Sequence, residues 1–261
     1  MNKAAALARH PKDRTIGILG GMGPLATVDF MRKIIVATPA EGDADHIPVV
    51  LSSNPQIPDR IVPIMEGTGE SPLPAMRAQR DLLVDTGAQC IAMPCNTAHH
   101  WYDELAAGCP VPFISIVDAV LGELKERTKP PARIGLIGTA ATLHSGFFQK
   151  RLADEGYECR VPDAEAMESQ VLPAIALVKK YRLAEAEALF RPAIEGLLAT
   201  NAGVAVLACT EVPAAFRDDA EWMERHCLDS TAALARACVA WALERSPQGL
   251  HGATSVAEDS G

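Results

Sequence analysis

Two cysteines follow apolar runs at matching points of the chain. Cys95 comes after the run 88–93 and Cys209 after the run 203–207, and each run is typical of a buried strand. Open α/β sheets bind ligands beyond the carboxyl ends of their strands, so both thiols are expected at binding positions. A free cysteine has a pKa of about 8.5, which a helix N-terminus lowers, so thiol and thiolate are both accessible near neutral pH. Such a pair can act as acid and base in proton transfer.

The stretches that position these cysteines form an internal repeat. Residues 16–20 (Ile-Gly-Ile-Leu-Gly) and 134–138 (Ile-Gly-Leu-Ile-Gly) share one strand-turn pattern, and each cysteine lies at nearly the same distance from the start of its half. Two equivalent lobes most simply pack around a pseudo-two-fold axis, which carries equivalent strand ends to opposite walls of one cleft. Cys95 and Cys209 would then face each other across a ligand. That arrangement suits removal of a proton from one face of a carbon and its return on the other.

The predicted fold is α/β, with two similar lobes that each hold a mainly parallel sheet flanked by helices and are related by pseudo-two-fold symmetry, with the active site between them. A last helix is expected from Ser230, as its N-cap, to about Arg245. The predicted division is a flexible N-terminus at 1–14, lobe 1 at 15–116 plus 229–245, lobe 2 at 117–228 and a disordered tail at 246–261. Strands are expected at 15–19, 46–51, 88–93, 111–116, 132–137, 157–161 and 203–207.

The composition favours a globular protein whose partner is a small molecule. Hydrophobic residues make up 48% of the 261, and no apolar run approaches the roughly 18 residues of a membrane span. A net charge of −9 without a basic patch argues against nucleic-acid and membrane partners. The first residues lack a secretory pattern, which favours a cytoplasmic location. The seven cysteines form no C-x2-C pair with matching histidines, so we expect reduced thiols and no metal site.

Three further stretches hold candidate binding residues. The turn at 20–24 lacks the third glycine of a dinucleotide motif, and its backbone N–H groups, with Met22 and Gly23 as candidate contacts, suit a small carboxylate. The polar loop 52–60 holds Ser52 and Arg60 as further candidates. Glu211 either assists the second thiol or lies in the first turn of a helix, where a negative charge is favourable.

Three motifs together resemble those of the aspartate/glutamate racemase family, and of the aspartate racemases most closely. They are Gly-Gly-Met-Gly-Pro at 20–24, Pro-Cys-Asn-Thr-Ala-His at 94–99 and Cys-Thr-Glu-Val-Pro at 209–213, and the resemblance covers about residues 15–245. It implies a two-lobed isomerase that needs no cofactor, uses two opposed catalytic cysteines, forms a homodimer and acts on acidic amino acids. Arylmalonate decarboxylases of the same superfamily keep one of the two cysteines, so the presence of both favours racemisation.

The resemblance also implies roles for other residues. A basic residue in the second lobe should be a further cation; we prefer Lys179 to its neighbour Lys180, although Tyr181 stands where the family commonly has glycine. In aspartate racemases an arginine of a Pro-Asp-Arg loop binds the side-chain carboxylate, and Arg60 matches it. Residues that match contacts of the substrate's α-carboxylate and amine are Asn96, Thr97, Thr139 and Thr210.

Other interpretations of the sequence remain open at this point. The same fold could support maleate isomerisation or malonate decarboxylation, which use one cysteine as nucleophile or proton donor. Two α/β lobes around a cleft could also form a non-catalytic module that binds acidic amino acids. His99 is expected to pack or cap the helix behind Cys95. The remaining cysteines, which have no partner in the repeat, are interpreted as core residues: Cys90, Cys109, Cys159, Cys227 and Cys238.

Overall fold

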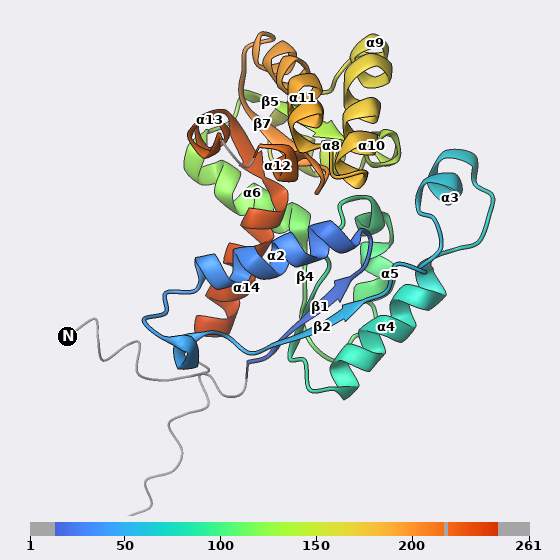
Figure 1. Ribbon diagram of the computed structural model, residues 1–261, viewed down its shortest axis with the longest axis vertical. Coiled ribbons are helices and arrows are strands. Elements are labelled where there is room, and N and C mark those ends of the chain that lie inside the picture. Colours follow the sequence, from blue (N-terminus) through green and yellow to red (C-terminus); the bar gives the residue numbers. More distant parts are fainter. Residues whose placement is uncertain (1–13, 217–218, 245–261) are drawn as a thin grey trace, which may run out of the picture.

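The computed structural model describes residues 14–216 and 219–244, and it contains two parallel four-stranded sheets. The predictions for the two ends, 1–14 and 246–261, lie outside the described residues except for Arg14. One sheet occupies the lower half of Figure 1 and the other the upper half, with helices around both. This arrangement confirms the predicted α/β class with two similar lobes.

Both sheets have the same strand order. The first contains β1 (Ile16–Gly20), β2 (Val49–Ser53), β3 (Cys90–Ala92) and β4 (Phe113–Ile114) in the order β2-β1-β3-β4. The second contains β5 (Ala132–Gly138), β6 (Tyr157–Arg160), β7 (Ala202–Ala208) and β8 (Cys227–Asp229) in the order β6-β5-β7-β8. In each sheet the chain moves first to one side and then to the other, so the crevice between the first and third strands is a topological switch point. Ligands of doubly wound sheets bind at such points.

Helices flank both sheets. Those of the first half are α2 (Pro24–Ala37), α3 (Ile61–Glu66), α4 (Leu73–Asp85), α5 (Tyr102–Ala106) and α6 (Ile116–Arg127), with 3₁₀ turns η1 (Asp43–Asp45) and η2 (Thr97–Trp101). Those of the second half are α7 (Ala140–Ser145), α8 (Phe147–Asp154), α9 (Ala164–Ala166), α10 (Leu172–Lys179), α11 (Leu183–Leu198), α12 (Val212–Ala215), α13 (Ala220–His226) and α14 (Ser230–Leu243), with the π-helical segment η3 (Met167–Val171). Among the described helices, none is long and apolar enough to cross a membrane.

The two sheets share part of their core. Helix α14 packs against both α2 and α6, and α6 also packs against α8, so these helices join the halves (Figure 1). One buried cluster contains Ile16 and Phe30 of the first half together with Ile134 and Val204 of the second. The halves are therefore connected by apolar packing and not only by the linking segment at 128–131. At the edge of this region Arg14 lies over the ring of Trp241, 5.2 Å from its centroid, so the two ends of the described chain meet.

Some local expectations were wrong. Ser230 was expected to cap the last helix, but Asp229 is the cap, and its carboxylate accepts hydrogen bonds from the backbone N–H groups of Thr231 and Ala232. Ser230 is instead the first helical residue, which leaves its hydroxyl free for other partners. Strand β8 was not predicted because its two apolar residues, Cys227 and Leu228, stand between His226 and Asp229 and form no longer apolar run. The proposed limits of the two lobes remain a prediction.

Candidate active site

Cys95 lies three residues beyond β3, and its side chain is only 6% exposed. Burial raises the pKa of its thiol, while the charge of Arg60 and the backbone N–H groups of Thr97 and Ala98 lower it. These N–H groups belong to η2, which begins at Thr97. The start of a helical turn therefore points donors at the sulfur, as expected from the sequence.

Cys209 directly follows β7 and is 2% exposed. Its Sγ donates a hydrogen bond to Oε2 of Glu211 at 3.1 Å, and the hydroxyl of Thr210 donates to the same oxygen at 3.2 Å. Burial, the Glu211 charge and this hydrogen bond raise the pKa of Cys209, whereas the charge of Lys179 lowers it. The carboxylate is therefore a direct partner of this thiol.

The two thiols share an electrostatic environment. Glu211, which contacts Cys209, also raises the pKa of Cys95. Each thiol has one cation that lowers its pKa, Arg60 for Cys95 and Lys179 for Cys209. The positions of Cys95 and Cys209 in the fold are equivalent, since each follows the third strand of its sheet. The two equivalent cysteines therefore lie in one region that contains both positive and negative charges.

Arg60 and Lys179 are held at the borders of this region. Nη1 of Arg60 donates to the carbonyl oxygens of Ile57 and Pro58, at 3.1 and 2.9 Å, which fixes the guanidinium to its own loop. Lys179 is the last residue of α10. Two residues later Tyr181 has φ +61°, a left-handed conformation that favours glycine, which explains why glycine suits this position.

Three threonine hydroxyls connect the two halves beside Cys95. Thr97 Oγ1 lies 3.1 Å from that of Thr139 and 2.9 Å from that of Thr142, and the latter two are 2.9 Å apart. Thr97 comes from η2, Thr139 is the N-cap of α7, and Thr142 lies within that helix. Thr97 and Thr139 were predicted site residues, whereas Thr142 was missed. Its position three residues after Thr139, one helical turn on, is the signal that could have found it.

In the Gly-rich turn after β1, the backbone passes very close to the backbone of Asn54. Gly21 has φ +98°, and an added Cβ would lie 2.4 Å from backbone atoms of Asn54, so glycine is required here. Met22 in this turn is 4% exposed, and the carbonyl of Gly23 accepts a hydrogen bond from the Thr27 hydroxyl at 2.9 Å. The turn and the end of β2 are tied together by a residue that the sequence did not reveal: Gln79, whose Nε2 donates to the carbonyl oxygens of Gly20 and Ser52 at 3.1 and 2.6 Å.

Behind Cys95, two buried side chains hold the backbone. His99 accepts a hydrogen bond from the N–H of Ile116 at Nε2, so Nδ1 carries the proton and donates to the carbonyl of Cys95 at 2.8 Å. Burial lowers the pKa of His99 to about 4, which keeps the ring neutral. Asn96 donates from Nδ2 to the hydroxyl of Ser230 at 3.0 Å. His99 thus packs behind the cysteine, and Ser230 is a partner that local sequence does not indicate.

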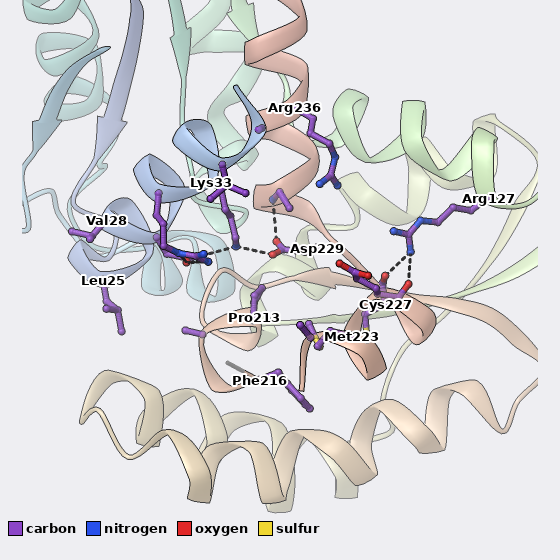
Figure 2. Close-up of a pocket in the computed structure, with 18 residues that line it drawn as sticks. Leu25, Val28, Lys33, Arg127, Pro213, Phe216, Met223, Cys227, Asp229 and Arg236 are labelled. Carbon is purple, nitrogen blue, oxygen red and sulfur yellow. Dashed lines mark hydrogen bonds and ion pairs between the residues drawn. The ribbon is translucent and has the colours of Figure 1, made fainter. Parts of the chain in front are cut away.

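A separate groove of about 880 Å³ lies away from both cysteines, between α2 and the segment 213–236 (Figure 2). Several of its charged side chains have partners within the protein. Lys33 reaches from α2 to Asp229 at 2.6 Å and to Asp29 at 2.5 Å. Arg127 donates to the carbonyl of Cys227 at 2.6 Å. Neither thiol lines this groove, so its size does not identify it as the reaction site.

Comparison with known proteins covers both halves of the chain. The profile of a family described as Asp/Glu/Hydantoin racemase matches residues 19–238, which is most of the sequence. The chain belongs to this family. It is 30% identical to the broad specificity amino-acid racemase RacX of Bacillus subtilis over 231 residues, which cover 86% of this chain and 96% of that protein. Membership in the family makes the chain an isomerase of the amino-acid racemase type.

Solved structures of the family have the same fold. Aspartate racemase from Picrophilus torridus matches with a TM-score of 0.77 and 34% identity, over 89% of this chain and 95% of that one. Glutamate racemase from Francisella tularensis, solved with D-glutamate, matches with a TM-score of 0.61 over 88% of this chain and 81% of that one. At 15% identity the second likeness concerns the fold alone.

Proposed function

We propose that this family member is a PLP-independent racemase of acidic amino acids, with aspartate as its main substrate and glutamate as a second candidate. Cys95 and Cys209 are the proposed acid and base. No cofactor is needed in this mechanism, because the two thiols supply both proton transfers. The substrate enters as a small molecule with two carboxylates and one ammonium group.

The proposed reaction removes a proton from one face of Cα and adds a proton to the opposite face. The thiolate of one cysteine takes the α-proton, so the C–H bond breaks and an S–H bond forms. The electron pair left on carbon is delocalised into the α-carboxylate. The thiol of the other cysteine then gives its proton to the opposite face, which inverts the centre and leaves that sulfur as a thiolate. Atoms and charges balance, and the two sulfurs have exchanged protonation states.

The observation that supports this mechanism most is the shared influence of Glu211 on both thiols. Its carboxylate bonds to Cys209 and also raises the pKa of Cys95. A charge that acts on both groups favours a pair in which one sulfur is protonated, since only one thiolate is compatible with a nearby anion. The cations Arg60 and Lys179 favour the thiolate form on either side.

The same cations support an acidic substrate. Arg60 is the proposed partner of the side-chain carboxylate, and Lys179 is the proposed second cation of the site. For the α-carboxylate, the proposed contacts are the backbone of Met22 and Gly23 with the hydroxyls of Thr97, Thr139 and Thr210, and Ser52 is proposed to border the site. The likeness to a racemase named for broad specificity makes a panel of amino acids the appropriate screen.

Replacement of either cysteine tests the mechanism. Cys95→Ala and Cys209→Ala should each lower racemisation of L-aspartate by roughly 10² to 10⁴-fold, because each removes one of the two proton carriers. Cys90→Ala is the matched control, since Cys90 is buried in β3 but has no role in proton transfer, and it should keep most of the activity. Chiral chromatography and deuterium incorporation at Cα in D₂O measure the reaction.

The outcomes separate the competing functions. Full racemisation by either catalytic variant would contradict the two-cysteine mechanism. Conversion of maleate or decarboxylation of a malonate by the unaltered protein would indicate the other reactions of this fold. Aspartate binding without turnover would indicate a binding module. A homodimeric assembly and a cytoplasmic location remain proposals that the resemblance supports.

A further inference from the structure

Asn96 and Ser230 lie side by side in the interior although 134 residues separate them in sequence. Asn96 is 2% exposed and Ser230 1%. Nδ2 of Asn96 donates to Ser230 Oγ at 3.0 Å, and Ser230 Oγ donates to the carbonyl of Leu207 at 2.7 Å. These bonds connect the residue after Cys95 with α14 and with β7, the strand that leads to Cys209.

The single proton of Ser230 fixes the orientation of the Asn96 amide. The carbonyl of Leu207 can only accept, so the hydroxyl proton is used there and Ser230 Oγ can only accept from Asn96. The NH₂ group of Asn96 must therefore face Ser230. Its other end, Oδ1, is buried and has no hydrogen-bond partner within the described structure. A buried acceptor without a partner is unfavourable, and a ligand that donates to it removes this cost.

We propose that Ser230 is a positioning residue that keeps Oδ1 of Asn96 as a free acceptor, and that this acceptor selects ligands with a protonated α-amino group over the same diacids without one. This inference rests on the proposed function, because it names the part of an amino acid that Asn96 recognises. In the opposite orientation the amide would present NH₂, which repels an ammonium group and attracts a carboxylate. Asn96 directly follows Cys95, so an ammonium group held there brings its own carbon, Cα, towards that thiol.

The affinities for L-aspartate and succinate test the inference, since these ligands differ in the amino group. Ser230→Ala removes the acceptor of Nδ2 and frees the amide to rotate. Affinity for aspartate should then fall roughly tenfold while that for succinate changes less than about twofold, as measured by calorimetry. Thr38→Val is the matched control, because it removes another buried hydroxyl that donates to a carbonyl, that of Ile34 at 2.7 Å. It should leave both affinities unchanged.

A double-variant comparison separates positioning from a structural role. Asn96→Ala should lose the same selectivity, and Ser230→Ala combined with Asn96→Ala should lose no more than Asn96→Ala alone, because Ser230 acts through Asn96. Equal weakening of both ligands by Ser230→Ala, or additive losses in the double variant, would overturn the inference. If Ser230→Ala does not fold, Ser230→Cys keeps the volume with a weaker acceptor and gives the same comparison.

Racemisation by the unaltered protein is measured separately over the amino-acid panel. Its absence would remove the proposed function, whereas the ratio of aspartate to succinate affinity would still decide the role of Ser230. Equal affinity of the unaltered protein for the two ligands would overturn the inference even if racemisation is observed.

Discussion

At the scale of single residues, the carboxylate of Glu211 influences both thiols. Burial is the main reason why the pKa of Cys209 lies well above its ordinary value, and the adjacent negative charge raises it further. The same charge adds to the effect of burial on Cys95. In this structure, therefore, the two sulfurs favour the protonated form. A substrate that brings its own ammonium group and engages the anion would favour thiolate formation.

Glu211→Gln should lower the pKa of Cys209, because it removes a negative charge that stabilises the thiol over the thiolate. The pH at which Cys209 becomes reactive towards iodoacetamide should move down by roughly one unit or more. Mass spectrometry of the Cys209 peptide over a pH series measures this midpoint. Glu195→Gln, an exposed residue of α11 with the same loss of charge, should leave the midpoint unchanged. An upward shift in Glu211→Gln would contradict the assignment.

The residues of the proposed site differ in how far the sequence could predict their positions. Cys95, Asn96, Thr97 and Cys209 lie in short motifs after strands, so the local pattern was sufficient to place them in the fold, while their roles remain a proposal. Ser230 was predicted only as a helix cap, because its contact with Asn96 spans 134 residues and no local pattern encodes it. Gln79 was missed for the same reason, since its partners come from other elements of the fold, whereas the three-residue spacing of Thr142 from Thr139 was a local signal that went unused.

At the scale of elements, the site is closed by contacts between the halves. Helix α7 packs against both η2 and α3, and the threonine hydroxyls of Thr97 and Thr142 meet at this boundary. Both thiols are almost completely buried beside this boundary. The positions of strands β1 to β7 were predictable from the apolar runs. Helix α3 was not, because its six residues contain Pro63 and lie in a segment rich in turn residues.

The start of α14 depends on an ion pair that joins it to α2. The side chains of Lys33 and Asp229 are 11% and 17% exposed, and Asp229 also caps the helix. Burial acts to raise the pKa of Asp229, but the charge and hydrogen bond of Lys33, together with hydrogen bonds from Thr231 and Ala232, outweigh it, so the pKa lies below its ordinary value. This pair holds the segment from which Ser230 reaches Asn96.

Lys33→Met should lower the free energy of unfolding by about 3 kcal/mol, because it leaves the buried carboxylate of Asp229 without its cation. Urea denaturation at neutral pH measures the loss. Lys125→Met is the control: its pair with Glu155 is far more exposed, with side chains 51% and 38% accessible. That exposed pair should contribute less than about 1 kcal/mol. Equal losses of unfolding free energy in the two variants would show that the buried pair stabilises the fold no more than the exposed pair does.

At the scale of the whole molecule, stability should be greatest between about pH 6.5 and 9. Burial lowers the pKa of His99 from 6.5 to about 4, so its stabilising contribution is present above pH 6.5 and is lost as the pH falls towards 4. Burial raises the pKa of Cys90 and Cys227 from 9.0 to about 12. Their contribution is present below pH 9 and is lost as the pH rises towards 12.

Denaturation midpoints over a pH series check this window. Above pH 9 each of these two thiols should remove about 1.4 kcal/mol of stability per pH unit, since the unfolded chain releases a proton that the folded chain keeps. In Cys90→Ala, stability should fall less steeply with pH above pH 9, by the contribution of one thiol. Because one apolar cluster spans both halves, a single transition is expected throughout. A midpoint independent of pH between 9 and 10 would contradict the burial of these thiols.

The stacking of Arg14 on Trp241 has a consequence for the connectivity of the chain. The first and last described elements meet at one place on the molecule, so a short covalent link between them would close the backbone into a ring without displacing either sheet. New ends could then be opened in the segment that connects the halves, 128–131. The order in which the two halves are synthesised would be reversed while the neighbours of every buried residue stayed the same. Such a circular permutant should therefore reach the same fold, whichever half is synthesised first.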